Sequence, residues 1–251
     1  MIDVTRETID SAFECLTNHE RYSRWFADFQ AVVNLYTAAE RAFAGQNNLN
    51  DFEIIYEELR GRWQVFRGTR QHWDVETIYS QLNNLDQGVR ALSLSRLQDI
   101  NWLDIWNCVC AMREIKQTQS GPSLVAISKF LHFWNPHLFV IFDNTVVESW
   151  VFGHKWLSDL LCSETVDDIL HRLQIQENGR LSKYLRVLIF ADNLLRENPY
   201  ILEAFAQRVA QMAEQAGFLN NINIGSYEAI AVEHFLMGLV ELPPGGVEVQ
   251  R

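Results

Sequence analysis

The chain has 251 residues, of which 48% are hydrophobic and 21% charged, and its formal net charge is −11 at pH 7. A chain of this length buries roughly three quarters of its unfolded surface, so it fits one large domain or two closely packed ones. No apolar stretch approaches the ~20 residues of a membrane-spanning helix, so a soluble protein without membrane contact is expected. The acidic balance argues against a protein that coats nucleic acid with its whole surface, although a local basic groove is compatible with it.

The N-terminal sequence MIDVTRETID lacks the basic-then-apolar pattern of a signal peptide, so a cytoplasmic location is expected. Four cysteines, Cys15, Cys108, Cys110 and Cys162, form neither a C-x-x-C pair nor a zinc spacing. Free thiols are therefore the favoured interpretation, and no metal site is predicted from them.

Helices are predicted throughout, because the first proline is Pro122 and no strand-like alternation precedes it. The expected helices cover residues 21–44, a segment capped by Asp51, and then 74–84, 86–97, 100–117, 124–134, 144–152, 165–176, 181–197, 199–216 and 226–240. Only LFVIF, residues 138–142, looks extended, and five residues cannot build a sheet alone.

The predicted class is therefore all-α, a multi-helix array. A soft boundary divides an N-terminal helical part, residues 1–119, from a C-terminal helical part, residues 120–242. The two parts can equally form one domain, because no low-complexity linker separates them. Residues 243–251 have the composition of a flexible tail.

A basic segment, RGRWQVFRGTRQHW at residues 60–73, has no acidic residue. It contains four arginines, Arg60, Arg62, Arg67 and Arg70, interleaved with Trp63, Phe66 and Trp73. Guanidinium groups fork onto phosphate oxygens while aromatic rings stack on exposed bases, so this segment suits a DNA-facing surface. The alternative is that the arginines pair with surface carboxylates such as Glu57, Glu58 or Asp74.

The stretch SKFLHFWNPHLFVIFDN, residues 128–144, places charge inside an apolar run. The helix expected at 124–134 is apolar on nearly all sides except for Ser128, Lys129 and His132, which share one stripe. A lysine there either reaches the surface along its carbon stem or points into a cleft. In an apolar cleft, desolvation would lower its pKa and make the amine a nucleophile.

Asn135 and Pro136 end this helix, and the residues up to Asp143 are mostly extended. Eight extended residues travel up to roughly 26 Å, enough for Asp143 to return past Lys129.

The helix expected after Asp143 has a cap of its own, since Thr145 and Glu148 form a T-x-x-E capping box. Asp143 then lies near a helix N-terminus, where its carboxylate can stabilise positive charge or take a proton from water. The alternative is that Asp143 is itself a cap or anchors Asn144 and Thr145, while Lys129 reaches the surface.

A glycine-bearing hairpin, an apolar helix, a proline, a short extended run and an aspartate follow one another in SGPSLVAISKFLHFWNPHLFVIFDNTV, residues 120–146. This order resembles the core of the helix-hairpin-helix DNA glycosylases. The phrase SKFLHFWNPHLFVIFD looks most like the divergent branch of the archaeal 8-oxoguanine glycosylases, to which bacterial antiphage glycosylases acting on modified phage cytosine are similar. The match covers about a tenth of the 251 residues.

The resemblance implies that Asp143 stabilises the oxocarbenium-like sugar as the base leaves. It implies that the hairpin around Ser120, Gly121 and Ser123 offers backbone groups to a DNA phosphate. It also implies that the target base is flipped into an apolar, aromatic-lined pocket. The candidates for that pocket are His132, Trp63 and Asn144.

The chain departs from the family pattern in two places. The usual L-P-G-x-G hairpin is reduced to SGPS, and Ser123 stands where typical members carry the catalytic lysine. Lys129 is the candidate catalytic lysine at a different position of the site. It belongs to the SK-x-L-H pattern, which is part of the stretch that resembles the divergent branch. If Lys129 attacks C1′, a Schiff base forms and the strand is cleaved; if water attacks, an intact abasic site remains.

The leading hypothesis is a DNA glycosylase, a hydrolase that excises a modified base, as in antiviral defence against modified phage DNA. It requires neither a metal nor an organic cofactor; its partner is DNA that carries a modified base, and the sequence leaves protein partners unknown. The alternative is a catalytically silent all-α module that reads modified DNA or binds a protein. A metal-dependent nuclease is disfavoured, because Asp167 and Asp168 lie in a helix-capping sequence, SETVDD.

Overall fold

The computed structural model describes residues 3–18, 29–44, 48–67, 72–97, 101–143, 147, 151–153, 164–175, 179–217, 223–242 and 249–250. Most of these residues lie in helices and the strands span only two residues each, so the predicted all-α class is confirmed. The α-helices among them are α1 (Arg6–Asn18), α3 (Phe29–Ala42), α4 (Leu49–Gly61), α5 (Val75–Asn83), α6 (Gln87–Arg90), α7 (Trp102–Ala111), α8 (Leu124–Trp134), α10 (Glu164–Arg172), α11 (Arg180–Glu197), α12 (Tyr200–Gln215) and α13 (Glu228–Glu241). Two 3-10 turns, η1 (Leu94–Arg96) and η4 (Asn223–Ser226), and the short strands β1 (Asp3–Val4), β2 (Gln117–Thr118), β3 (Gly121–Pro122) and β4 (Val249–Gln250) complete the described elements.

Most expected helices recur within a few residues, but two were predicted too long. The helix expected at 86–97 divides into α6 and η1. The reason is Asn135, whose side-chain amide donates to the carbonyl oxygens of Val89, Arg90 and Leu92 at 3.0–3.1 Å. A helix continuing through this stretch would use those same carbonyls for its own ladder.

The helix expected at 100–117 ends at Ala111, and the chain then turns into the β2–β3 hairpin. The extended run 138–142 is assigned to no strand. Of the helix expected at 21–44, the described part is α3, because residues 19–28 lie outside the described ranges. The helix expected at 144–152 lies mostly outside them too.

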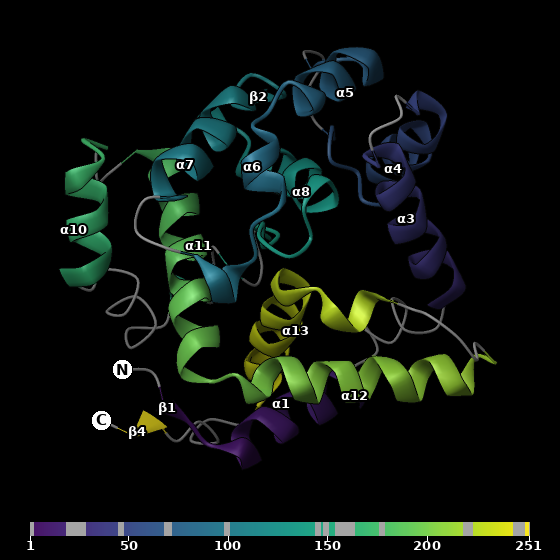
Figure 1. Ribbon diagram of the computed structural model, residues 1–251, viewed down its shortest axis with the longest axis vertical. Coiled ribbons are helices and arrows are strands. Elements are labelled where there is room, and N and C mark those ends of the chain that lie inside the picture. Colours follow the sequence, from purple (N-terminus) through teal and green to yellow (C-terminus); the bar gives the residue numbers. More distant parts are fainter. Residues whose placement is uncertain are drawn as a thin grey trace.

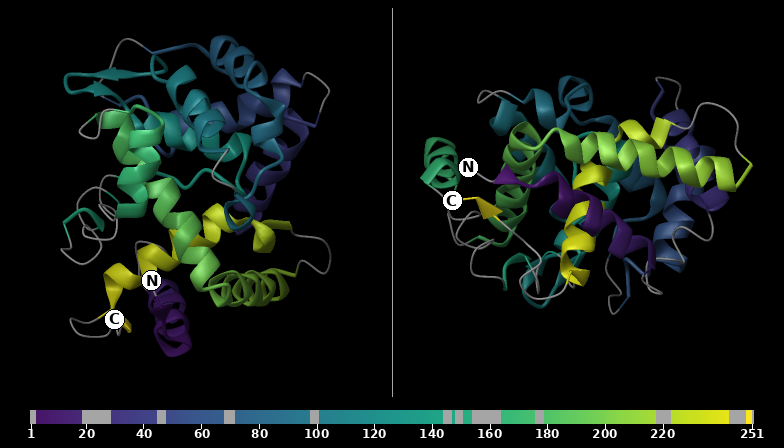
Figure 2. Two further views of the ribbon diagram at one scale, coloured as in Figure 1. Left: turned by 60° about the vertical axis from the view of Figure 1, so that its left-hand side comes forward. Right: turned by 90° about the horizontal axis from the view of Figure 1, so that it is seen from below.

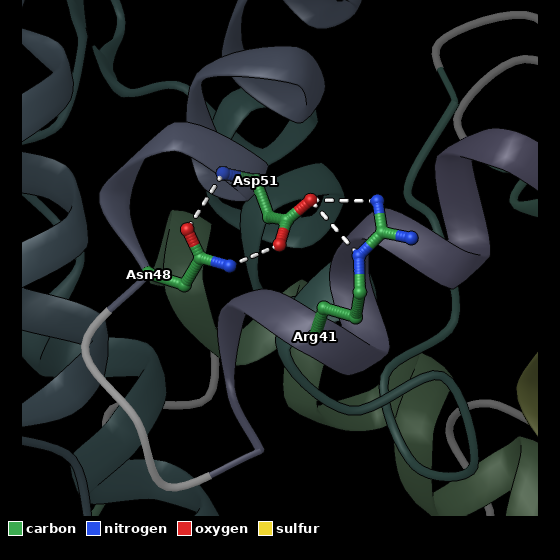
Figure 3. A network of polar contacts seen from close by, with 3 residues as sticks. All are labelled: Arg41, Asn48 and Asp51. Carbon is green, nitrogen blue, oxygen red and sulfur yellow. Dashed lines mark hydrogen bonds and ion pairs between the residues drawn. The ribbon is translucent and has the colours of Figure 1, made fainter.

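A junction between α3 and α4 shows how local polar groups set the helix boundaries (Figure 3). Asp51 was predicted to be the cap of α4, but the N-cap is Asn48, whose side-chain oxygen accepts from the amide of Asp51. The side-chain amide of Asn48 donates to the Asp51 carboxylate in return. Asp51 also accepts from Arg41 at 2.7 and 3.0 Å, which ties the end of α3 to the start of α4.

Helix α11 joins the two sides of the molecule (Figures 1 and 2). It contacts α7 and α8 on one side and α12 and α13 on the other. The described apolar core is one cluster that runs through both expected parts, so the soft boundary near residue 119 coincides with no break in the packing. No helix in the described ranges is long and apolar enough to cross a bilayer.

The two ends of the chain meet. Helix α1 packs against α12 and α13, and β1 pairs with β4 through Val4 with Val249 and Asp3 with Gln250 (Figure 1). At the α1–α13 contact, a Cβ added to Gly238 would overlap the backbone carbonyl of Ala12, so the two helices approach more closely than any other residue would allow. Part of the expected flexible tail is therefore paired.

Candidate functional site

The residues before Asp143 are held in place by the side chains of α8. The hydroxyl of Ser128 accepts from the amide of Phe142 at 2.9 Å, and Nδ1 of His132 donates to the carbonyl of Phe139 at 2.7 Å. Because the segment forms no sheet, these bonds replace the ladder that a strand would provide. The polar stripe expected on α8 thus positions the returning chain.

His132 acts as a structural link. Since the Phe139 carbonyl can only accept, Nδ1 carries the proton and Nε2 accepts from the hydroxyl of Tyr36 at 2.7 Å. Burial lowers the pKa of His132 to about 4, so the ring is neutral at pH 7. Tyr184 of α11 supports the same segment by donating to the carbonyl of Val140 at 2.9 Å. His132, expected in the base pocket, lies behind Tyr36 and is not among the pocket-lining residues.

Lys129 and Asp143 line the same pocket, which has a volume of about 170 Å³. Its lining consists of apolar and aromatic side chains around a few ionisable ones: Leu16, Tyr36, Trp63, Lys129, Ile141, Asp143, Ile230, Glu233, His234 and Met237. These residues come from α1, α3, α8, α13, the turn after α4 and the segment after α8. The chain after α8 therefore returns past Lys129, as the length of the extended segment allowed.

The side chain of Lys129 points into this pocket. The residue is 9% exposed, and its Nζ lies 4.8 Å from the centre of the Trp63 ring. Burial lowers the pKa of the amine, and the charges of Asp143 and Glu233 oppose that shift. Lys129 therefore points into a cleft and does not extend along its carbon stem to the surface.

Glu233 is a pocket residue that the sequence analysis missed. Burial, reinforced by the charge of Asp143, raises the pKa of Glu233 to about 8, while Lys129 opposes the rise. The signal that would have found it is a carboxylate in the middle of an apolar helical run, IAVEHFLMGLV. Such a residue in α13 is the acidic counterpart of Lys129 in α8.

Trp63 reaches the pocket because the chain turns sharply after α4. Its amide donates to the carbonyl of Glu58 at 3.1 Å, and Gln64 adopts a left-handed conformation with φ of 48°. Lys116 then fixes the turn by donating from Nζ to the carbonyl of Val65 at 2.7 Å. The Trp63 ring also packs edge-on against Phe133 of α8, with ring centres 5.8 Å apart.

The three described arginines of the basic segment have local partners. Arg60 pairs with Glu57 at 3.1 Å and Arg62 with Glu58 at 3.4 Å, as the alternative interpretation expected. These pairs are exposed, so each is worth only ~0–1 kcal/mol. Arg67 donates to Gln64 at 3.3 Å.

Two depressions lie along the basic segment, and one of them adjoins the pocket. An open groove of about 570 Å³ is lined by Arg60, Gln64, Phe66, Arg67 and His72. The His72 ring stacks on the Phe66 ring, with ring centres 4.1 Å apart. A second hollow of about 240 Å³ includes Arg62 and shares Tyr36, Trp63 and Lys129 with the pocket. Arg70 lies outside the described residues.

The hairpin before α8 takes the shape that its glycine permits. Gly121 has φ of +105°, a conformation that side chains rarely adopt, and Ser120 accepts from Arg180 at 2.9 Å. Ser123 is buried: its amide donates to the Lys116 carbonyl at 3.0 Å, and its hydroxyl caps α8. Ser120 and Gly121 therefore remain at the surface, whereas the polar groups of Ser123 are used within the protein.

Asn144, the third residue expected in the base pocket, lies outside the described residues. Within the described ranges, no group of three or more His, Cys, Asp and Glu side chains is arranged to hold a metal ion. Comparisons of this chain with family models, with curated proteins and with solved structures found no match.

Proposed function

We propose that this protein is a DNA glycosylase that flips a modified base out of DNA and excises it. The observation that carries the proposal is that Lys129 and Asp143 line one small pocket, which shares a wall with a hollow containing Arg62 of the basic segment. A carboxylate can stabilise the sugar cation, an aromatic wall can hold the flipped base, and an amine can attack C1′.

Each of the two charged residues has a distinct role in this reaction. The carboxylate of Asp143 stabilises the positive charge that develops on the sugar as the base departs. Lys129, whose pKa is lowered by burial, supplies an amine that can attack C1′. Attack by Lys129 yields a Schiff base and strand cleavage, whereas attack by water leaves an intact abasic site.

The pocket has room for one six-membered ring, as a flipped pyrimidine would need. A cavity of roughly 150 Å³ holds one benzene ring, and the pocket has a volume of about 170 Å³. Trp63 and Tyr36 supply aromatic surface, and Ile141, Ile230 and Met237 supply apolar surface. Flipped bases are held between side chains of this kind.

DNA would approach across the basic segment. Weak surface pairs such as Arg60 with Glu57 exchange for phosphate contacts at little cost. The overall charge of −11 then confines DNA to this region. Following the resemblance to antiphage glycosylases, we expect the substrate to be phage DNA that carries a modified base.

The test is incubation with genomic DNAs that carry different natural base modifications, followed by mass detection of released bases. The unmodified protein is expected to release one kind of modified base. Asp143→Asn should abolish release while keeping DNA affinity, because the lost charge acts on the transition state. Asp168→Asn, the same change at an exposed position of α10, is the matched control.

Borohydride added to the same mixtures reports on Lys129. Attack by its amine gives a trapped protein–DNA adduct that Lys129→Met eliminates, with Lys183→Met as control. Unchanged DNA binding with no released base from any DNA would instead indicate a catalytically silent reader of modified DNA.

A further inference from the structure

We infer that Glu233 is the proton donor to the departing base, a third member of the site beside Lys129 and Asp143. This inference rests on the proposed glycosylase function and assigns a role to a side chain that the family resemblance does not cover.

The position of Glu233 supports this role. Its side chain lines the pocket together with Lys129 and Asp143, so a base seated there meets all three. Helix α13 holds it firmly, because the carboxylate of Glu228 accepts from the amide and the hydroxyl of Ser95 at 2.6 and 2.7 Å. The close contact of Gly238 with Ala12 fixes the other half of the helix.

The carboxyl group of Glu233 keeps its proton in the pocket. Burial and the negative charge of Asp143 raise the pKa of Glu233 to about 8, so its carboxyl is mostly protonated at pH 7. Two carboxyls with different environments can divide the work, one as acid and the other as electrostatic stabiliser.

The other groups around Glu233 do not remove this proton. Burial lowers the pKa of His234 to about 3, so the neighbouring imidazole is neutral at pH 7. The hydroxyls of Tyr36 and Tyr184 have pKa values raised by burial and by the charge of Glu233, so they stay protonated. Among the described residues, α1 contributes only the apolar Leu16 to the pocket lining. Within the same part of the chain, Lys129 is the basic side chain that lines the pocket with Glu233 and opposes the rise of its pKa.

The step balances without any external reagent. The bond between C1′ and the base nitrogen breaks, its electron pair goes to the base, and the base takes the proton of the Glu233 carboxyl. C1′ receives an electron pair from water or from the neutral amine of Lys129. The proton that this nucleophile then loses returns to the Glu233 carboxylate. On the water route this restores the enzyme, whereas on the amine route Lys129 stays bonded to C1′ and proceeds to the Schiff base.

Glu233→Gln tests the inference, since glutamine keeps the size and polarity of the side chain but has no acidic proton. The expected result is a loss of base release at pH 7 by about 100-fold, in the range of general acid catalysis, with unchanged DNA affinity. In the unmodified protein the rate should fall as pH rises through about 8, and the variant should lack this decline. Glu241→Gln, at the end of the same helix, should match the unmodified protein.

A second measurement separates proton donation from a structural role. Two duplex oligonucleotides are compared, one with the excised base and one with a fluorinated derivative that leaves more readily as an anion. The defect of Glu233→Gln should shrink on the fluorinated substrate, because a better leaving group needs less protonation. The defect of Asp143→Asn should remain, and a merely misfolded variant would lose both substrates equally.

The outcomes distinguish the two proposals. Base release by Glu233→Gln at the unmodified rate, or an unmodified protein whose rate does not decline above pH 8, overturns the donor role and leaves the glycosylase intact. Absence of release by the unmodified protein from every DNA overturns both.

Discussion

The Nζ of Lys129 lies 4.8 Å from the centre of the Trp63 ring, in the pocket that both residues line with Asp143. A cation over an aromatic face gains ~0.5–2 kcal/mol, depending on how far it is shielded from water. This contact favours the charged amine, whereas burial favours the neutral one. Trp63 therefore affects both the position of the amine and its tendency to lose a proton.

Trp63→Leu is expected to lower the pKa of Lys129 further, since the contact that stabilises the ammonium is lost. The chain has only four lysines, so NMR titration of their ¹³C-methylated side chains resolves Lys129, with Lys129→Met identifying its signal. Trp63→Phe keeps a ring and should give an intermediate value. A pKa of Lys129 that is unchanged in Trp63→Leu would contradict the proposed contact.

Ser128→Ala should impair the site without touching DNA, because it leaves the amide of Phe142 without its partner and loosens the segment that carries Asp143. We expect stability to fall by ~1–3 kcal/mol and base release to fall while DNA affinity stays the same. Chemical denaturation and single-turnover assays measure the two effects. Ser123→Ala removes the hydroxyl that caps the N-terminus of α8 and should affect stability alone.

The stability of the protein should depend on the proton of Glu233. An ordinary glutamate ionises near pH 4.5, whereas the folded protein holds this proton until about pH 8. The unfolded state is therefore increasingly favoured between these values, and the free energy of unfolding should fall by a few kcal/mol at most as pH rises through this window. Urea unfolding at pH 5 and 8 should show a smaller decline for Glu233→Gln, and equal declines would argue against the raised pKa.

Gly238→Ala should destabilise the contact between α1 and α13, because the added Cβ overlaps the Ala12 carbonyl. Overpacking of this kind costs ~1–3 kcal/mol, and the shift of α13 should also displace Glu233. Thermal unfolding measures the loss. Gly61→Ala places the same atom where nothing lies within 4 Å and should leave stability nearly unchanged.

Several features of this protein could be predicted from neighbouring residues alone. The all-α class followed from the late first proline and from apolar spacing, and the bounds of α8 followed from Pro122 before it and Asn135 and Pro136 after it. Lys129 was recognisable as a site candidate because burying a charged side chain in an apolar helix costs free energy. Signals of this kind act over one or two turns, where helix geometry is regular.

Distant contacts decided the rest. The end of α6 depends on Asn135, which takes carbonyls that lie more than forty residues earlier in the chain. The direction of Lys129 depends on Trp63 from the turn after α4, and the third ionisable group, Glu233, arrives on a helix near the other end. Helical spacing determines which residues share a face, but the packing of whole helices determines which faces meet, and that is a property of the folded chain.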